Sequence, residues 1–493
     1  MKRGQKLALN TAIGIAKQLV YVICGFILPR YMLQYYGSTV NGLVSSITHF
    51  LGFISLLDMG VGAVVQANLY KPLADNDINQ ISRVYVSAQK FFRKIAVILV
   101  AYVVILCVLL PGTYSDNFSS AYSISLIIII EIGTFSQFFF GIVLETLLTA
   151  YQKAYVHMSV YIVTTIVNTV VSIFMIQHGL SIHSVKFFTA CIYLVRPAIE
   201  GIYVKRHYSL DKKIKYIGEP IKQKWNGFSQ HLASVINNNI DIIILSMFST
   251  LNNVSVYSVY YMVISGITQI IMTAATGLES MFGNMIANEE KDILVSSFSR
   301  IEWLIHTVVT VVFTVSMIMI VPFVGIYTDG ITDTNYIVPS FAMILVAAYA
   351  MQCLRVPYFR VIKAAGHFRQ TKNGAYITAA INTFVSMLLV YWYGMIGIAI
   401  GTFLAMTFHT VYLAFYLKSN ILNRSTKKFF LLLLKDVVVM FVTIWISNCL
   451  QIRCSNYLTW VIWAIAITVL TCFIEVCVSS MFEPGWLERY ISK

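Results

Sequence analysis

The sequence predicts an all-α polytopic membrane protein with about 14 transmembrane helices, because of its composition and its long apolar segments. Of its 493 residues, 58% are hydrophobic and 11% are charged, whereas soluble domains carry about 25% charged residues. The apolar segments run for about 20 residues, which is the length of a membrane-spanning helix; barrel strands alternate over only about ten residues. This composition excludes a soluble enzyme, a disordered chain and a secreted disulfide scaffold.

The spans follow one another through short connections, which leaves no room for a soluble domain. Backbone groups in lipid must bond within their own segment, so each span is expected to be helical. A span longer than the bilayer is thick can tilt. The fourteen predicted spans are, in order, residues 8–29, 40–67, 95–111, 121–149, 157–178, 184–204, 226–249, 254–281, 301–325, 337–361, 374–393, 395–417, 429–449 and 457–478.

The distribution of Lys and Arg supports this number of spans. Cytoplasmic loops of membrane proteins collect these residues, and the chain has a net charge of +14. With the MKRGQK start inside, 29 of the 35 Lys and Arg residues fall on cytoplasmic segments, Lys435 among them. One missed helix would reverse this bias further along the chain. Both termini are therefore expected in the cytoplasm, and no nucleic-acid partner is expected.

A repeat at an offset of 214 residues divides the chain into two lobes. The segments that begin at Ala150 and Ala364 share the pattern NTxVS, in the fifth and eleventh spans. Because these spans are six apart, both copies cross the membrane in the same direction. This predicts two six-helix lobes related by a pseudo-twofold axis along the membrane normal, plus two C-terminal helices. The expected parts are an N-lobe, a basic cytoplasmic linker, a C-lobe, and the last two helices with the tail: residues 1–204, 205–225, 226–417 and 418–493.

Three stretches resemble a known transporter family. They are the YGS…NGL turn between the first two spans, the LLDMG end of the second span, and NNNIDIIILSMF in the seventh. Together with the two-lobe architecture, they resemble the polysaccharide-transport (Wzx-type) flippases of the multidrug/oligosaccharidyl-lipid/polysaccharide (MOP) exporter superfamily, in particular those of Gram-positive capsule and exopolysaccharide synthesis.

The resemblance implies a non-enzymatic transporter of the bacterial plasma membrane. Its substrate would be an undecaprenyl-pyrophosphate-linked oligosaccharide, moved from the inner to the outer leaflet by alternating access. The implied partners are this lipid-linked oligosaccharide and membrane lipids, with a polysaccharide polymerase and glycosyltransferases as further candidates. No cofactor is expected, and coupling to a Na⁺ gradient, an H⁺ gradient or the membrane potential stays open.

Three cations inside spans are the first candidates for substrate binding. Lys17, Arg196 and Arg355 lie six to nine residues from the inner ends of their spans, or about 9–14 Å deep at about 1.5 Å per residue. Guanidinium groups bind phosphate oxygens bidentately, and Lys adds a point charge. We expect them to contact a pyrophosphate headgroup. Alternatively, Arg196 could be neutralised by Glu200, one helical turn away.

Further polar residues have two interpretations each. Arg30 and His49, toward the outer half of their spans, and Asn238 in the seventh span are candidates for substrate contact. The alternatives are interfacial anchoring for Arg30 and structural hydrogen bonding for the other two. Buried carboxylates are candidates for a coupling ion or for a structural role: Asp58, Glu145, Asp241 and Glu279. No catalytic or metal-binding residue is expected.

Two other functions remain open. A cation-coupled multidrug or small-molecule exporter would keep the fold, although cationic drugs favour acidic cavities. A membrane polysaccharide polymerase or glycosyltransferase is the third alternative, but such enzymes usually carry a sizeable outer loop. No GxxxxGK[ST] nucleotide-binding loop is present, so the chain alone is not expected to use ATP.

Overall fold

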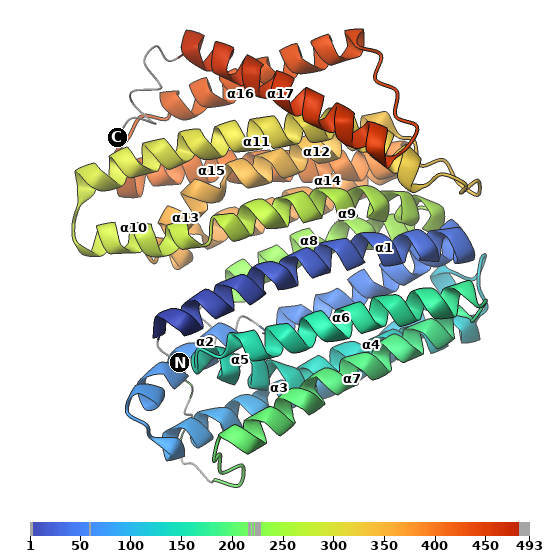
Figure 1. The fold of residues 1–493 in the computed structure, drawn as a ribbon, viewed down its shortest axis with the longest axis vertical. Coiled ribbons are helices and arrows are strands. Elements are labelled where there is room, and N and C mark those ends of the chain that lie inside the picture. Colours follow the sequence, from blue (N-terminus) through green and yellow to red (C-terminus); the bar gives the residue numbers. More distant parts are fainter. Residues whose placement is uncertain (1–2, 59–60, 215–217, 219–220, 222–227, 483–493) are drawn as a thin grey trace. The chain divides into compact units, whose positions relative to one another are not determined.

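The computed structural model describes residues 3–58, 61–214, 218, 221 and 228–482. Every regular element of this described part is a helix (Figure 1). Twelve helical stretches within it are long and apolar enough to cross a bilayer. The chain is therefore a multi-pass membrane protein, and the predicted all-α polytopic fold class is confirmed.

The sequence predicts two spans more than these twelve, and both of the additional spans also lie on helices. Helix α1 (Arg3–Gly52) contains the first predicted span and the start of the second, and a single non-helical residue divides it, Gly37 with φ 79° and ψ 175°. This is the glycine of the predicted turn, and such a φ costs glycine little. Helix α8 (Phe228–Phe248) contains the seventh span, but its described apolar part, Ser234–Phe248, is shorter than a full span.

The first compact unit comprises residues 1–239. Helix α6 packs against α1 and α7, and α4 packs against α7. Its elements after α1 are η1 (Phe53–Asp58), α2 (Val61–Ala74), α3 (Ile78–Thr113), α4 (Ser120–Ser136), the π-helical turn η2 (Gln137–Gly141), α5 (Ile142–Ala150), α6 (Ala154–Gln177) and α7 (Ile182–His207). Of the predicted linker 205–225, residues 215–217, 219–220 and 222–225 lie outside the described residues.

The second compact unit comprises residues 240–493, so the division between the units falls within α8. In this unit α15 packs against α12 and α14, and α11 packs against α16 and α17. Its remaining elements are α9 (Leu251–Ala274), α10 (Gly277–Ala287), α11 (Lys291–Tyr327), α12 (Pro339–Leu354), α13 (Val356–Ala364), α14 (Phe368–Tyr393), α15 (Met395–Leu417), the π-helical turn η3 (Lys418–Leu422), α16 (Lys427–Cys449) and α17 (Tyr457–Phe482).

Local sequence signals explain where several of these helices begin. Ser119, Ser181 and Thr250 stand immediately before α4, α7 and α9, and each side chain accepts a hydrogen bond from a backbone N–H of the first turn. Such caps satisfy donors that the helix itself leaves unpaired. The break between α12 and α13 falls at Arg355, two residues before Pro357.

Two glycines allow α15 to lie unusually close to α14. Gly397 and Gly401 are four residues apart, the small-residue spacing found where membrane helices approach closely. A Cβ at Gly401 would lie 2.3 Å from Ser386 Oγ, and a Cβ at Gly397 would lie 2.4 Å from the Leu389 carbonyl oxygen. The absence of both side chains therefore brings the polar residues of α14 and α15 together.

One charge assignment from the sequence is wrong. Lys435, counted above with the cytoplasmic cations, is 2% exposed and lies within α16. Its ammonium group forms an ion pair with Glu475 of α17. A charge excess predicts topology from loops, and it cannot show that an individual Lys inside a span has a buried partner.

Candidate functional site

Two of the predicted cations meet at one aromatic ring in the first unit. Lys17 of α1 has its Nζ 4.6 Å from the centroid of the Tyr161 ring on α6. The Arg196 guanidinium of α7 lies 4.4 Å from the same centroid and 4.3 Å from that of Tyr193. Cations are attracted to the faces of aromatic rings, most strongly where water is excluded. The two positive charges thus share one aromatic ring.

Hydroxyl groups of α6 fix the orientation of Arg196. Its Nε donates to Thr164 Oγ1 at 2.6 Å, and its Nη2 donates to Thr165 Oγ1 at 2.9 Å. Arg196 and Glu200 form no ion pair within 4 Å, although both are described, and Glu200 is only 2% exposed. The alternative that Arg196 is simply neutralised by direct contact with Glu200 is therefore not what the structure contains.

This arrangement can bind an anion. Two threonine hydroxyls and two tyrosine rings hold the guanidinium in place. Lys17 and Arg196 are both half-buried, whereas Glu200 is buried, so the cations form the more accessible part of the cluster. A fixed guanidinium loses less conformational entropy when it binds a phosphate group.

Arg355, the third predicted cation, belongs to the second unit. It stands at the break between α12 and α13, and its Nη1 donates to His409 Nδ1 of α15 at 2.7 Å. Met406 Sδ lies 3.5 Å from the same nitrogen. No carboxylate contacts Arg355 in the part of the chain that the structure describes. Whether the three cations serve one cavity stays a prediction.

Asp241 of α8 is the centre of a buried polar cluster in the second unit. Its carboxylate accepts hydrogen bonds from three elements: Tyr257 Oη of α9 at 2.8 Å, Asn382 Nδ2 of α14 at 3.0 Å and Thr402 Oγ1 of α15 at 2.7 Å. Ser386 Oγ donates to Asn382 Oδ1 at 3.3 Å, and Thr402 Oγ1 lies at the same distance from that oxygen. A carboxylate with neighbouring amide and hydroxyl oxygens suits a hard cation such as Na⁺.

The repeat found in the sequence has the same local contact in both copies. Ser172 Oγ lies 3.4 Å from Asn168 Oδ1 on α6, and Ser386 Oγ lies 3.3 Å from Asn382 Oδ1 on α14. The surroundings differ between the copies. On α6 the repeated Thr164 accepts from Arg196, whereas on α14 the repeated Asn382 donates to Asp241. One copy therefore holds a cation and the other a carboxylate.

The other candidates for substrate contact lie apart from these clusters. Arg30 is half-buried on α1, seven residues before Gly37. His49 Nδ1 lies 3.0 Å from Asn239 Oδ1 within the first unit. Asn238 is exposed on α8, whereas the neighbouring Asn237 is buried. The roles of Arg30, His49 and Asn238 stay predictions.

The remaining carboxylates have structural partners where their side chains are described. Glu145 Oε1 accepts from Gln137 Nε2 at 2.9 Å, across the π-helical turn η2. Glu279 of α10 pairs with Arg360 Nη1 at 3.4 Å and Lys363 Nζ at 3.1 Å. Asp58 ends η1, and its side chain lies outside the described residues.

Several contributing residues did not stand out in the sequence. Tyr161 and Tyr193 are two of 30 tyrosines. His409 is an ionisable residue inside a predicted span, which is an unusual place for histidine, but no spacing links any of the three to a cation far away in the chain. The repeat did contain Thr164, Asn382 and Ser386, but their polar partners appear only in the structure. The described residues contain no group of three or more His, Cys, Asp or Glu side chains that could hold a metal ion.

Comparison with known proteins identifies the fold. No family model and no curated protein matches the sequence. Among solved structures, the lipid II flippase MurJ in an inward closed conformation matches with a TM-score of 0.72 and 15% identity, over 97% of this chain and 100% of that one. An inward-facing multidrug resistance MATE family transporter of the MOP superfamily matches with a TM-score of 0.63 and 13% identity, over 83% of this chain and 96% of that one.

A third solved structure belongs to the same superfamily. It is a MOP superfamily transporter from Pyrococcus furiosus, described as having a binding pocket of reversed polarity, and it matches with a TM-score of 0.54 and 14% identity over 85% of this chain and 96% of that one. The chain therefore has the fold of MOP superfamily flippases and transporters. These solved structures are transport proteins rather than enzymes.

Proposed function

We propose that the chain is a flippase for a lipid-linked oligosaccharide. It would move undecaprenyl-pyrophosphate-linked repeat units from the inner to the outer leaflet of the bacterial plasma membrane, for capsule or exopolysaccharide synthesis. Both termini would lie in the cytoplasm, and the two lobes would alternate in exposing the substrate to each side. Glycosyltransferases would act before the flippase, and a polysaccharide polymerase would act after it.

The observation that carries this proposal is the pair of cations at Tyr161. Lys17 and Arg196 lie on helices that are long and apolar enough to cross a bilayer, and neither forms an ion pair with a carboxylate among the residues that the structure describes. Placing such charges in a bilayer costs about 2.5–3.5 kcal/mol each on insertion scales, so they usually serve a function. An anionic headgroup such as a pyrophosphate offsets that cost, and Arg355 offers a third cation in the second unit.

We further propose that the Asp241 cluster binds the coupling cation. The cluster joins α8, α9, α14 and α15 around one carboxylate. Asp241, Asn382, Ser386 and Thr402 would supply oxygen ligands to Na⁺, and a proton on Asp241 is the competing possibility. Either ion neutralises a carboxylate that otherwise stays buried and charged, which is costly in a medium of low dielectric constant.

The decisive experiment measures flipping in vesicles that contain only the purified protein. A lipid-linked oligosaccharide with a fluorescent sugar is placed in both leaflets, and a membrane-impermeant quencher or glycosidase reports how fast the protected fraction becomes accessible. We expect transport with a pyrophosphate linkage and none with the same glycan on an uncharged lipid. Equal transport of both would contradict recognition through the headgroup.

The alternative is a cation-coupled exporter of drugs or other small molecules. The similarity to a multidrug resistance MATE family transporter favours it. The same vesicles separate the two functions, because an exporter would accumulate a cationic dye under a Na⁺ or H⁺ gradient. Dye transport without movement of the lipid-linked glycan would establish the alternative.

A further inference from the structure

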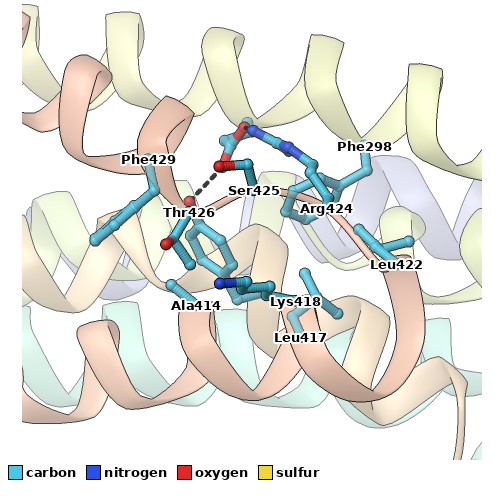
Figure 2. Close-up of a pocket in the computed structure, with 11 residues that line it drawn as sticks. Phe298, Ala414, Leu417, Lys418, Leu422, Arg424, Ser425, Thr426 and Phe429 are labelled. Atoms are coloured by element: carbon cyan, nitrogen blue, oxygen red, sulfur yellow. Dashed lines mark hydrogen bonds and ion pairs between the residues drawn. The ribbon is translucent and has the colours of Figure 1, made fainter.

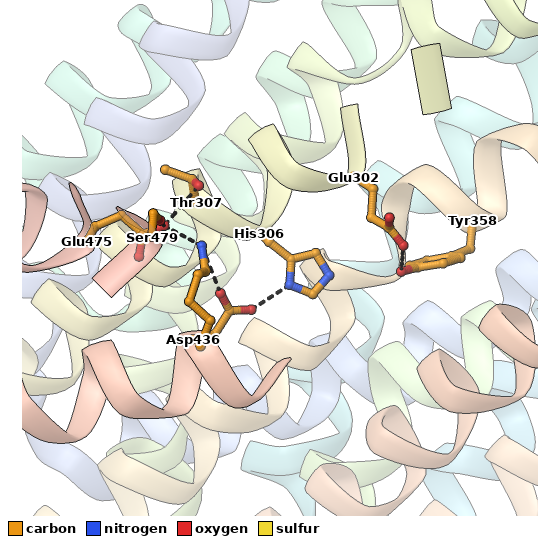
Figure 3. A network of polar contacts seen from close by, with 8 residues as sticks. Glu302, His306, Thr307, Tyr358, Asp436, Glu475 and Ser479 are labelled. Atoms are coloured by element: carbon orange, nitrogen blue, oxygen red, sulfur yellow. Dashed lines mark hydrogen bonds and ion pairs between the residues drawn. The ribbon is translucent and has the colours of Figure 1, made fainter. Parts of the chain in front are cut away.

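A buried polar network joins α11, α16 and α17 in the second unit (Figure 3). Lys435 of α16 forms an ion pair with Glu475 of α17 and lies 3.5 Å from Asp436 Oδ1. His306 Nδ1 of α11 lies 2.5 Å from Asp436 Oδ2. The exposed fractions are 0% for His306, 2% for Lys435, 7% for Asp436 and 3% for Glu475. The helices that carry this network differ from those that carry the Asp241 cluster of the same unit.

The charges in this network balance only if it holds one additional proton. Lys435 contributes one positive charge, and Asp436 and Glu475 contribute one negative charge each. With a neutral His306, the four side chains therefore sum to one negative charge. An additional proton on the imidazole brings the sum to zero. A buried net charge is strongly unfavourable, whereas a balanced buried network is tolerated.

The imidazole has a free position for that proton. Its Nδ1 faces the Asp436 carboxylate and must donate to it, because the carboxylate only accepts. Its Nε2 is buried and has no hydrogen-bond partner within the described structure. Glu475 is stabilised separately, by Thr307 Oγ1 at 3.0 Å and Ser479 Oγ at 3.3 Å, in addition to Lys435.

Two further charged groups near the network, Glu302 and Arg424, are paired with each other. Glu302 lies one turn before His306 on α11, and it accepts from Tyr358 Oη of α13 at 2.5 Å. Arg424, in the connection between α15 and α16, forms an ion pair with the other oxygen of Glu302. Among the described residues, neither Glu302 nor Arg424 forms a hydrogen bond or ion pair with His306. The charged partner of the imidazole is therefore Asp436.

A pocket lies beside this region (Figure 2). It is lined by Glu302, Tyr358, Arg424, Phe429 and the hydroxyl residues Ser425 and Thr426, among others. Phe429 closes its inner side, with its ring centroid 5.6 Å from that of Tyr358 and 6.1 Å from that of His306. One aromatic ring therefore separates the polar pocket from the imidazole.

We propose that the His306–Asp436 pair is a proton-binding site, beside the pocket at Glu302, whose occupancy controls how firmly α16 and α17 are held on α11. The site is independent of the transported substrate. Without the proton, repulsion by the uncompensated carboxylate weakens the contact between α11 and α16. With the proton, the four side chains form a neutral bridge between the three helices.

Thermal unfolding of the full-length protein in lipid nanodiscs, without substrate, tests this proposal. H306Q leaves two carboxylates against Lys435, and we expect its Tm at pH 6, where the wild type holds the additional proton, to be lower than that of the wild type by at least about 5 °C. D436N leaves Lys435, Glu475 and a neutral His306 in balance, so adding it to H306Q should restore most of the loss. H178Q, at an exposed histidine at the end of α6, is the matched control and should unfold as the wild type does.

The pH dependence gives a second measurement. The wild-type Tm should fall between pH 6 and pH 9, as the proton is lost, whereas the D436N and H306Q/D436N proteins should show little change over this range. The proposal is overturned if the losses of the two single variants add in the double variant. It is also overturned if D436N keeps the wild-type pH profile.

Discussion

At the scale of single residues, Arg196 is the side chain on which the proposed headgroup contact most depends. Its guanidinium already makes two hydrogen bonds to threonines and lies against two tyrosine rings. We expect R196A to weaken binding of a pyrophosphate-linked substrate by about 10- to 100-fold, since a hydrogen bond to a charged group contributes about 1.5–3 kcal/mol. R196K should recover only part of this, because Lys lacks the planar fork. Substrate-dependent quenching of tryptophan fluorescence measures both affinities.

A control separates this loss of binding from a loss of folding. R206A removes a cation of the same helix at its exposed end, where no described carboxylate or ring depends on it. It should leave both affinity and Tm unchanged. Wild-type affinity in R196A, with the protein folded, would remove Arg196 from the binding site.

Asp241 is the second residue whose role can be tested directly. If its cluster binds Na⁺, replacing choline chloride by NaCl at constant ionic strength should raise the Tm, because a ligand that binds only the folded state stabilises it. D241N and T402V should each abolish that rise. D292N changes an exposed carboxylate in the first turn of α11 and should keep it. A wild-type Tm that depends on pH but not on Na⁺ would instead favour a proton at Asp241.

At the scale of elements, the close contact between α14 and α15 positions the Asp241 cluster. G401A would place a Cβ 2.3 Å from Ser386 Oγ and 2.8 Å from the Ser386 backbone nitrogen. We expect α15 to be displaced, at a cost of about 1–3 kcal/mol, and the Na⁺-dependent rise in Tm to shrink. G25A is the matched control, because nothing lies within 4 Å of the added Cβ. Equal thermal stability of the two variants would show that this helix contact tolerates expansion.

The elements themselves could largely be predicted from the sequence, because apolar length alone determines a membrane span. The two exceptions have physical reasons. Gly37 bends α1 with one residue, so no polar loop separates the first two helices. The sequence alone predicts a cytoplasmic Lys435, because its partner Glu475 lies on another helix, 40 residues away, where no sequence pattern reveals it. Hydropathy describes segments one at a time, and it contains no information about which polar side chains meet across helices.

At the scale of the whole molecule, the sequence repeat and the fold agree on where polar residues concentrate. The NTxVS copies lie on α6 and α14. The α14 copy contacts Asp241 through Asn382, whereas on α6 the contact with Arg196 is made by Thr164, one turn before the copy. The offset of the repeat could be read from the sequence. The sequence did not show that the repeat contacts a cation on α6 and a carboxylate on α14, because Arg196 and Asp241 do not occupy equivalent positions of the repeat.

The orientation of the whole chain in the membrane is the remaining prediction. In a background with all eight Cys residues replaced by Ser, a cysteine at Ser115, in the exposed connection after α3, should react with a membrane-impermeant maleimide added to intact cells. A cysteine at Lys212, exposed after α7, should react only after permeabilisation. The physical basis is the excess of Lys and Arg around residue 212, since cytoplasmic loops retain positive charge. These two sites are separated by α4, α6 and α7, an odd number of spans once α4 and α5 are counted as one crossing, so they must lie on opposite sides. Labelling of both from outside would contradict the assigned spans, and labelling reversed at both sites would contradict the cytoplasmic location of the termini.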